Sequence, residues 1–354
     1  MGEQTTISQA LVESGFAPEV LDAYGFDVYD AESVRKVVRL NTSLGILALK
    51  KFKLSDEELD YSLAAMRHVK EQGFEVPGLI PTRDGRLYVT LEDAKYFVME
   101  WLQGRESKYS HIHDLALSAR GLGDFHKATR GFTPPSSSRL AGKEQWGSWT
   151  GHFLERIEEL RNWQVQAEQG GTPFDNMYAD VVAYGIQEAT RSVELLLSSR
   201  YEEISKLEQA EQGFCHHDYA HHNVLITQEN GQPGIAIIDF DYSISDIRAH
   251  DLASLILRNM KSDKWDARTA FFILKSYFER ATPHGGEERL LHAMIRFPQD
   301  LYEAARYHFV GKNRPADVLE SRLRKWAEQK HRRERFFRDF EDGARYVLEQ
   351  GKIR

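Results

Sequence analysis

The residues that could carry out chemistry lie closest together between positions 213 and 251. Asp218 follows two adjacent histidines, and Asn223 follows five residues later. A carboxylate can orient an attacking hydroxyl group, and carboxylate and amide oxygens can hold a metal ion against a phosphate. The types and spacing of these residues therefore suit the transfer of a phosphoryl group to a hydroxyl.

Two short apolar runs must position this cluster. Residues 224–226 (Val-Leu-Ile) and 235–238 (Ile-Ala-Ile-Ile) read as buried strands, and the residues between them include Asn-Gly and Pro-Gly, which are turn signals. Asp239 and Asp241 follow the second run directly. The pattern predicts a hairpin that presents an Asp, an Asn and a further Asp to one place.

The first hundred residues predict a small α+β lobe. A short helix is expected within 4–23, followed by strands over 24–29, 34–41, 46–52, 87–91 and 96–101, with a connector or edge strand at 77–81. Ser55 and Glu58 have the capping-box spacing of a helix start, and Gly73 ends that helix. Lys50 stands in the third strand, where a solvated edge charge is the common interpretation. Upstream of Asp218 and Asp239, it is also a candidate for contacting phosphates.

The character of the chain changes after residue 102. Helical periodicity dominates, with helices expected over 113–129, 148–167, 175–207, 249–261, 264–281, 285–297, 299–312 and 315–350. A Pro- and Ser-containing loop is expected over 131–147. The sequence thus divides into a mixed part, 1–102, and a mostly helical part, 103–354.

The composition excludes several classes of function. The net charge of −8 argues against broad attraction to nucleic acid or to an anionic membrane surface. Cys215 is the single cysteine, so there is no intramolecular disulfide, and we expect a small buried apolar side chain there. No stretch approaches the ~20 apolar residues that span a bilayer. The N-terminus lacks the pattern of a signal peptide, so synthesis without export by that route is expected.

Several motifs together resemble the protein-kinase-like superfamily. The segment 217–223, His-Asp-Tyr-Ala-His-His-Asn, resembles its catalytic loop. The segment 239–241, Asp-Phe-Asp, resembles its metal-binding Asp-Phe-Gly in the form usual in the aminoglycoside phosphotransferase and choline kinase branch. The segment 250–253 resembles the one that braces the catalytic loop in that branch. Residues 98–104 resemble its adenine-binding hinge, and 122–126 resemble its Leu-Ala-x-Leu-His helix.

The resemblance implies a two-lobed fold of the α+β class. Residues 1–102 would form a small nucleotide-binding lobe, an antiparallel sheet with one main helix. Residues 103–354 would form a larger, mostly helical lobe with the catalytic loop and the substrate pocket. ATP and Mg²⁺ are the implied cofactors, a nucleotide is the implied partner, and the acceptor is an unidentified small molecule or protein.

The resemblance also implies the roles of individual residues. Asp218 would orient the acceptor hydroxyl, and Asp218, Asn223 and Asp239 would form the catalytic set. The metal would be held by Asn223, Asp239 and Asp241. Lys50 would contact the phosphates.

The segment that resembles the adenine-binding hinge, residues 98–104, would supply the contacts to adenine. Adenine would bind the backbone at Glu100, Trp101 and Leu102. Downstream, Asp251 is expected to have a structural role.

More narrowly, the chain resembles the CotS-type spore coat proteins. The supporting segments are 79–85, 100–105 and 125–128, together with Gly131-Phe132 and Pro134-Pro135. This resemblance implies a location in the spore coat and other coat proteins as possible partners.

Two departures from the superfamily pattern bear on activity. No glycine-rich loop is predicted between the first two strands, where residues 29–33 stand instead. Ser62 occupies the helix position of the glutamate that usually pairs with the strand lysine, with Glu58 one turn earlier as a substitute. The alternative to an active phosphotransferase is therefore a structural or binding component of the coat that is catalytically weak or inactive.

Two further interpretations stay open from the residues alone. Asp218, Asn223 and Asp239 could be turn and cap residues, because Asp and Asn are favoured there. The four histidines at 216, 217, 221 and 222 could, with Asp218, bind zinc or a pair of metal ions, as in metal-dependent hydrolases.

Overall fold

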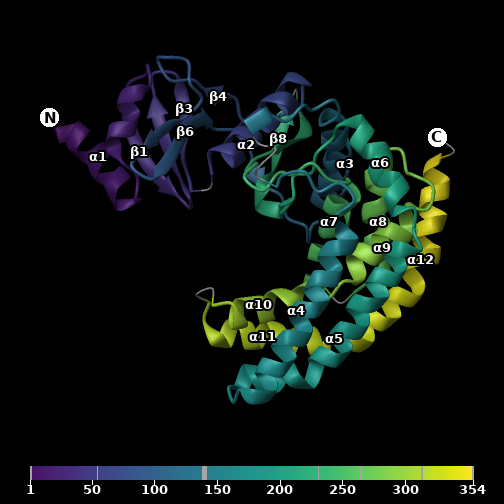
Figure 1. Ribbon diagram of the computed structural model, residues 1–354. Helices are drawn as coiled ribbons and strands as arrows, with labels where there is room; N and C mark the ends of the chain where they lie inside the picture. Colours follow the sequence, from purple (N-terminus) through teal and green to yellow (C-terminus); the bar gives the residue numbers. More distant parts are fainter. Residues whose placement is uncertain are drawn as a thin grey trace. The chain divides into compact units, whose positions relative to one another are not determined.

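The computed structural model describes residues 2–53, 55–137, 142–229, 231–263, 265–311 and 314–352 (Figure 1). The chain separates into two compact units, neither continuous in sequence. The sheet unit contains residues 1–107, 128–144 and 221–244, and the helical unit contains residues 108–127, 145–220 and 245–354. The hairpin predicted at 224–238 therefore belongs to the sheet unit, whereas the segment through Ala220 belongs to the helical unit.

The sheet unit is built on an antiparallel sheet. Its strands follow the order β1-β2-β3-β6-β4, with β5 paired to β6, and a smaller sheet has the order β7-β8-β9. The bounds are α1 Gly2–Glu13, a 3₁₀ turn Pro18–Ala23, β1 Val28–Val34, β2 Val37–Thr42, β3 Gly45–Phe52, α2 Asp56–Glu71, β4 Leu79–Ile80, β5 Val89–Leu91, β6 Ala94–Glu100, β7 Arg105–Glu106, β8 Val224–Glu229 and β9 Gln232–Ile237.

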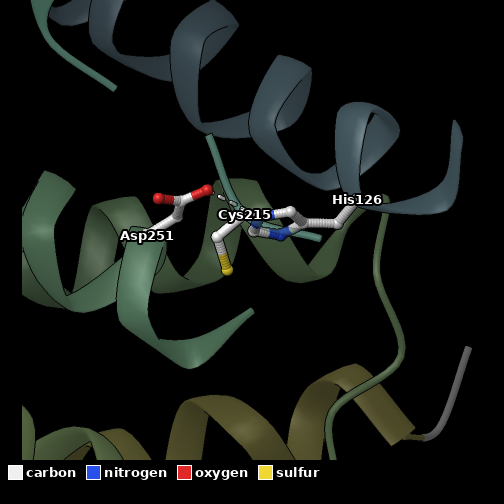
Figure 2. Close-up of side chains that lie close together, drawn as sticks. All are labelled: His126, Cys215 and Asp251. Atoms are coloured by element: carbon white, nitrogen blue, oxygen red, sulfur yellow. Dashed lines mark hydrogen bonds and ion pairs between the residues drawn. The ribbon is translucent and has the colours of Figure 1, made fainter. Parts of the chain in front are cut away.

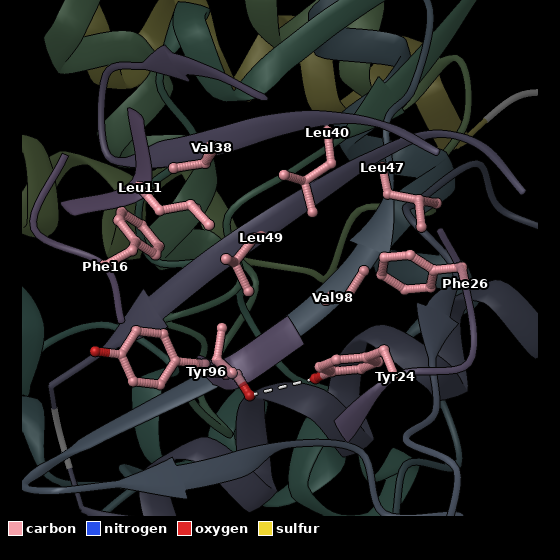
Figure 3. Packing of buried hydrophobic residues seen from close by; sticks show 11 residues of the cluster. Leu11, Phe16, Tyr24, Phe26, Val38, Leu40, Leu47, Leu49, Tyr96 and Val98 are labelled. Carbon is pink, nitrogen blue, oxygen red and sulfur yellow. Dashed lines mark hydrogen bonds between the residues drawn. The ribbon is translucent and has the colours of Figure 1, made fainter. Parts of the chain in front are cut away.

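One face of the large sheet carries the apolar core of this unit (Figure 3). Alternate residues of the central strands face the same way, so β2, β3 and β6 each contribute two buried side chains. The N-terminal segment packs on them through Leu11, Phe16, Val20, Tyr24 and Phe26. The same alternation sends Lys50 and Phe52 of β3 to the opposite face.

The structure corrects the predicted start of the sheet. The helix expected within 4–23 ends at Glu13, because Gly15 (φ 76°) breaks it and Pro18 begins a 3₁₀ turn. The first strand is Val28–Val34, not 24–29, so residues 29–33 lie within a strand. This strand is an edge strand whose side chains are mostly exposed, and it therefore lacks the apolar alternation that reveals buried strands.

The α2 capping box is confirmed. The Ser55 side chain accepts from the Glu58 N–H, and the Glu58 carboxylate accepts from the Ser55 N–H at 2.9 Å. Gly73, in the left-handed conformation (φ 81°), follows the end of the helix. These two signals set both ends of α2 as the sequence predicts.

The helical unit holds the remaining helices. Their bounds are α3 Ile112–Ala128, α4 Trp149–Gln169, α5 Pro173–Leu197, α6 Tyr201–Glu211, α7 Ala249–Asp263, α8 Ala267–Phe278, α9 Glu287–Arg296, α10 Gln299–Phe309, α11 Ala316–Glu328 and α12 Lys330–Lys352. The predicted helix 175–207 is two helices, because the Ser199 hydroxyl bonds the Leu196 carbonyl and the Tyr201 N–H in place of a continuing helix. The predicted helix 315–350 is likewise divided, at Gln329.

The predicted fold class is confirmed, with an antiparallel-sheet unit and a larger helical unit. The division into lobes at residue 102 stays a prediction. The sheet unit continues to residue 107 and also contains residues 128–144 and 221–244. Among the described residues, every helix is too short or too polar to cross a lipid bilayer.

Candidate active site

Lys50 is a buried lysine at the centre of an ionic cluster in the sheet unit, whose two carboxylates are partly exposed. Its strand, β3, is interior, paired with β2 on one side and β6 on the other. Only 6% of Lys50 is exposed, so it is not the solvated edge charge that an isolated strand lysine suggests. Its Nζ donates to Asp239 Oδ1 and to Asp241 Oδ1, each at 2.6 Å. The structure thus brings together three residues that the sequence proposed separately.

The charges in this cluster are strongly coupled. Burial alone would lower the pKa of Lys50, but the adjacent Asp241 and Asp239 carboxylates outweigh burial and raise it. Burial raises the pKa of Asp241, opposed by Lys50 and reinforced by the charge of Asp239. Two carboxylates therefore accept from the same side-chain ammonium.

The hairpin places Asn223 beside the start of the 239–241 segment. β8 and β9 pair antiparallel, with Val224 opposite Ile237. The Ile238 N–H continues the pairing by donating to the Asn223 carbonyl at 3.0 Å. Asn223 itself is buried at the end of a 3₁₀ turn. The predicted hairpin is confirmed, and it brings the backbones of the Asn and of the Asp-Phe-Asp segment together.

Asp239 adopts an unusual backbone conformation. Its φ is 70°, in the left-handed region that non-glycine residues seldom occupy. His217, immediately before Asp218, has φ 66°. Residues held in such conformations concentrate at functional sites, where surrounding contacts over-determine them.

The end of β6 is fixed by the Glu100 side chain. The carboxylate accepts from the Gly78 N–H at 2.8 Å and from Lys70 Nζ at 2.7 Å. The Glu100 N–H donates to Gly78, and the Trp101 N–H donates to Ile46. Within the described ranges, the Leu102 N–H has no such acceptor. Of the three predicted adenine contacts, Glu100 and Trp101 therefore have their backbone N–H groups in hydrogen bonds within the sheet unit.

In the helical unit, Asp218 is held by an arginine. Arg258 on α7 donates from Nη2 to Asp218 Oδ1 at 2.6 Å, and both side chains are about a third exposed. Arg258 is not among the residues predicted from the sequence, where it is one polar position on an amphipathic helix. Ser254, one turn earlier on the same helix face, contacts its Nε at 3.4 Å, and this i, i+4 pair is the only sequence signal for it.

The segment before Asp218 is anchored by Asp251. This fully buried carboxylate accepts from the backbone N–H groups of His216 at 2.7 Å and His217 at 2.8 Å. His126 Nε2 lies 3.2 Å from Asp251 Oδ2 (Figure 2). Burial would raise the pKa of Asp251, but the hydrogen bond and charge of His126 hold it well below its usual range. The contacts are those of the structural brace that the sequence predicts.

The ring of His217 is also fixed. It lies 4.5 Å from the ring of His250, which stacks on Trp149 at 4.7 Å. Burial, with the charge of His217, lowers the pKa of His250 to about 3. His250 is therefore neutral at physiological pH, and His217 packs against an uncharged ring.

His126, Cys215 and Asp251 are the one group of potential metal ligands that converges among the described residues. Figure 2 shows the three side chains close together. The Cys215 thiol donates to the Ile247 carbonyl at 3.1 Å, and burial raises its pKa well above its usual range. Cys215 is fully buried, as predicted. Among the described residues, this group does not include the histidines at 216, 217, 221 and 222.

Helix α2 supplies no carboxylate to Lys50. Ser62 is buried and its hydroxyl bonds the Glu58 carbonyl at 2.9 Å. Glu58, the proposed substitute, uses its carboxylate in the capping box. The ion pairs of Lys50 go instead to Asp239 and Asp241.

Solved structures share this fold. An aminoglycoside phosphotransferase from Alicyclobacillus acidocaldarius subsp. acidocaldarius superimposes with a TM-score of 0.76 at 23% identity, covering 92% of this chain and 96% of that one. An amicoumacin kinase in complex with AMP-PNP and Ca²⁺ superimposes with a TM-score of 0.58 at 15% identity, covering 94% and 93%. At these identities the likeness shows the fold.

Curated relatives match part of the chain. The homoserine kinase of Zymomonas mobilis subsp. mobilis is 24% identical over 208 residues, which is 59% of this chain and 56% of that kinase. The homoserine kinase of Sinorhizobium fredii is 26% identical over 219 residues, 60% of this chain and 57% of that kinase. The chain thus spans somewhat more than half the length of these relatives.

A match over a longer part of the chain shows its family. The sequence model described as the phosphotransferase enzyme family matches residues 30–291, well over half of the 354 residues. That range contains Lys50, the hairpin with the 239–241 segment, and the braced segment before Asp218. The chain therefore belongs to the phosphotransferase enzyme family.

Proposed function

We propose that this protein is an ATP-dependent phosphotransferase that transfers the γ-phosphate of ATP to a hydroxyl of a small molecule. The observation that carries the proposal is the buried Lys50, 2.6 Å from both Asp239 and Asp241. A phosphate-binding cation and metal-binding carboxylates are the parts that phosphoryl transfer requires on the nucleotide side.

The donor set fits Mg²⁺. Asp239 and Asp241 supply carboxylate oxygens and Asn223 supplies an amide oxygen, and hard cations of this kind prefer oxygen ligands. Both carboxylates accept from the Lys50 ammonium. Bound there with ATP, the metal would neutralise charge on the triphosphate.

The remaining nucleotide contacts would come from β3 and the end of β6. Lys50 would donate to phosphate oxygens. The Leu102 N–H would donate to adenine, while Glu100 holds the strand end in place through Gly78 and Lys70. β3 and β6 pair directly, with Leu47 opposite Glu100. Residues of one sheet would therefore make both the purine and the phosphate contacts.

Asp218 would orient the acceptor hydroxyl and accept its proton. Arg258 would keep this carboxylate in one rotamer through its hydrogen bond. Asp251 fixes the two preceding peptide groups. Asp218 and Asn223 are separated by four residues, so the chain limits their Cα atoms to at most about 18 Å apart.

The acceptor is proposed as a small hydroxyl compound, with amino alcohols the first to test. The curated relatives named above are homoserine kinases, and homoserine carries both an amine and a hydroxyl. The chain spans only part of those kinases, so homoserine itself is one candidate among this class.

A catalytically weak component of the spore coat is the second candidate. Ser62 favours it, because α2 lacks the carboxylate that would orient Lys50. The CotS resemblance and the coat location are inferred from short segments of the sequence. The curated relatives reported above are homoserine kinases. Retention of Asp218, Asn223 and Asp239 opposes this candidate.

Nucleotide binding separates the two. Mg·ATP at 100 times its Kd is expected to stabilise the protein by about 2.7 kcal/mol, seen as a rise of several degrees in Tm. The Asp239→Ala variant should lose most of this rise, because it lacks a metal ligand. ATP with EDTA is the control for metal dependence.

Absence of any shift in the wild-type protein at millimolar Mg·ATP would sink the enzymatic proposal. An equal shift in Asp239→Ala would show that nucleotide binds without the 239–241 segment, which contradicts the assigned metal site.

A further inference from the structure

Lys143 is a second buried lysine beside the 239–241 segment. It lies near the end of the segment 131–147, which the sequence predicts to be a simple loop, and only 6% of it is exposed. Its Nζ donates to the backbone carbonyl of Asp241 at 3.1 Å. A lysine is seldom buried to this degree without a specific partner. Its contact is with the backbone of a proposed metal ligand, and the carboxylate of that ligand contacts Lys50.

The residues where this segment begins contact α2. His68 Nε2 lies 3.0 Å from the Arg130 carbonyl. The Phe132 ring packs edge-on against Tyr61 with ring centroids 5.3 Å apart. These contacts, from both the middle and the last turn of α2, hold residues 130 and 132 against that helix.

Lys143 itself closes the connection. Its Nζ lies 5.8 Å from the centroid of the Tyr61 ring, and Tyr61 is fully buried. An ammonium over an aromatic face is attracted to it, more so when desolvated. One side chain therefore touches both α2, through Tyr61, and the 239–241 segment, through the Asp241 carbonyl.

We propose that Lys143 is a positioning residue that fixes the backbone of the 239–241 segment relative to α2. This connection takes the place of a direct ion pair between β3 and α2, for which Ser62 lacks the carboxylate. The inference deepens the proposed function and rests on it for the meaning of the 239–241 segment. Through Asp241, Lys143 would set the direction of a metal ligand while itself touching neither metal nor nucleotide.

Hydrogen exchange tests the positioning directly and without nucleotide. In Lys143→Met, which keeps the apolar stem and removes the charge and donors, the amides of residues 239–245 should exchange at least about tenfold faster. Lys143→Arg, which retains a cation and donors, should recover part of the protection. Lys53→Met, the loss of an exposed lysine in the same unit, is the matched control and should leave this peptide unchanged.

Binding provides the second readout. The Kd for Mg·ATP should rise about tenfold in Lys143→Met, with a smaller rise in Lys143→Arg. Unchanged exchange of 239–245 in a folded Lys143→Met variant would overturn the proposal. If exchange is faster in Lys143→Met but the wild-type protein does not bind Mg·ATP, the positioning role is upheld. That result would contradict only the proposed function.

Discussion

Replacing Asp218 by Asn is expected to lower kcat by about 10²–10⁴-fold, the usual contribution of a general base. Asn keeps the size of the side chain and can still contact Arg258 through its amide oxygen, but it cannot accept the proton of the attacking hydroxyl. Binding of Mg·ATP should change little, because the nucleotide contacts proposed here lie on β3, β6 and the 239–241 segment. The measurement is ADP release with a hydroxyl acceptor, alongside the Kd for Mg·ATP.

Asp180→Asn provides a matched control in the same unit. Asp180 is exposed on α5, and its substitution should leave kcat and Kd at wild-type values. Retention of more than a tenth of kcat in Asp218→Asn would contradict the role assigned to Asp218. A parallel loss of Mg·ATP affinity would point to misfolding of the segment instead of loss of the base.

The second large effect concerns stability. Asp251→Asn is expected to lower the free energy of unfolding by about 3–5 kcal/mol, the cost of breaking a buried charged network. The carboxylate accepts from the N–H groups of His216 and His217 and contacts His126. An Asn side chain has one acceptor oxygen, so one of these backbone donors would be left buried without a partner.

Asp246 offers a matched comparison. It is also buried and also accepts two N–H bonds, from Trp149 Nε1 at 2.7 Å and from Ile247 at 2.8 Å. Burial, however, raises its pKa well above the usual range, opposed by those two hydrogen bonds. Asp246→Asn removes an unfavourable buried charge along with one acceptor, so it should change stability by only about 1 kcal/mol. The measurement is urea denaturation at pH 7. Similar losses of unfolding free energy in Asp251→Asn and Asp246→Asn would contradict the distinction between the two aspartates.

The two aspartates should also respond oppositely to pH. The folded pKa of Asp251 is depressed, so its contribution is fully present above the unfolded pKa near 4 and declines as the pH falls below it. The folded pKa of Asp246 is raised, so the folded state binds more protons above pH 4, and stability falls as the pH rises through that window. In Asp251→Asn and in Asp246→Asn, the corresponding dependence of the free energy of unfolding on pH should be lost.

The parts of the site that sequence could predict are those with local signals. The hairpin of β8 and β9 follows from two apolar runs and a Gly-containing turn, and the Asn223 and Asp239 positions follow from where those strands begin and end. Ser55, Glu58 and Gly73 define α2 because caps are chosen by nearest neighbours along the chain. Each of these signals spans fewer than twenty residues.

The parts that sequence could not predict depend on contacts between distant residues. Arg258 is forty positions from Asp218, and Lys143 is ninety-eight positions from Asp241. Nothing in the spacing of such pairs distinguishes them from ordinary surface charges. β1 was displaced in the prediction for a related reason: an edge strand with exposed side chains has no apolar period to detect.

Transfer of label from Mg·[γ-³²P]ATP to small hydroxyl compounds, beginning with amino alcohols, tests the central claim most directly. The expected result is a labelled phosphate ester whose formation requires Mg²⁺ and falls by at least about 10²-fold in Asp218→Asn. Binding of Mg·ATP with no labelled ester from any hydroxyl compound, or labelled ester formed equally by Asp218→Asn, would contradict phosphoryl transfer at this site.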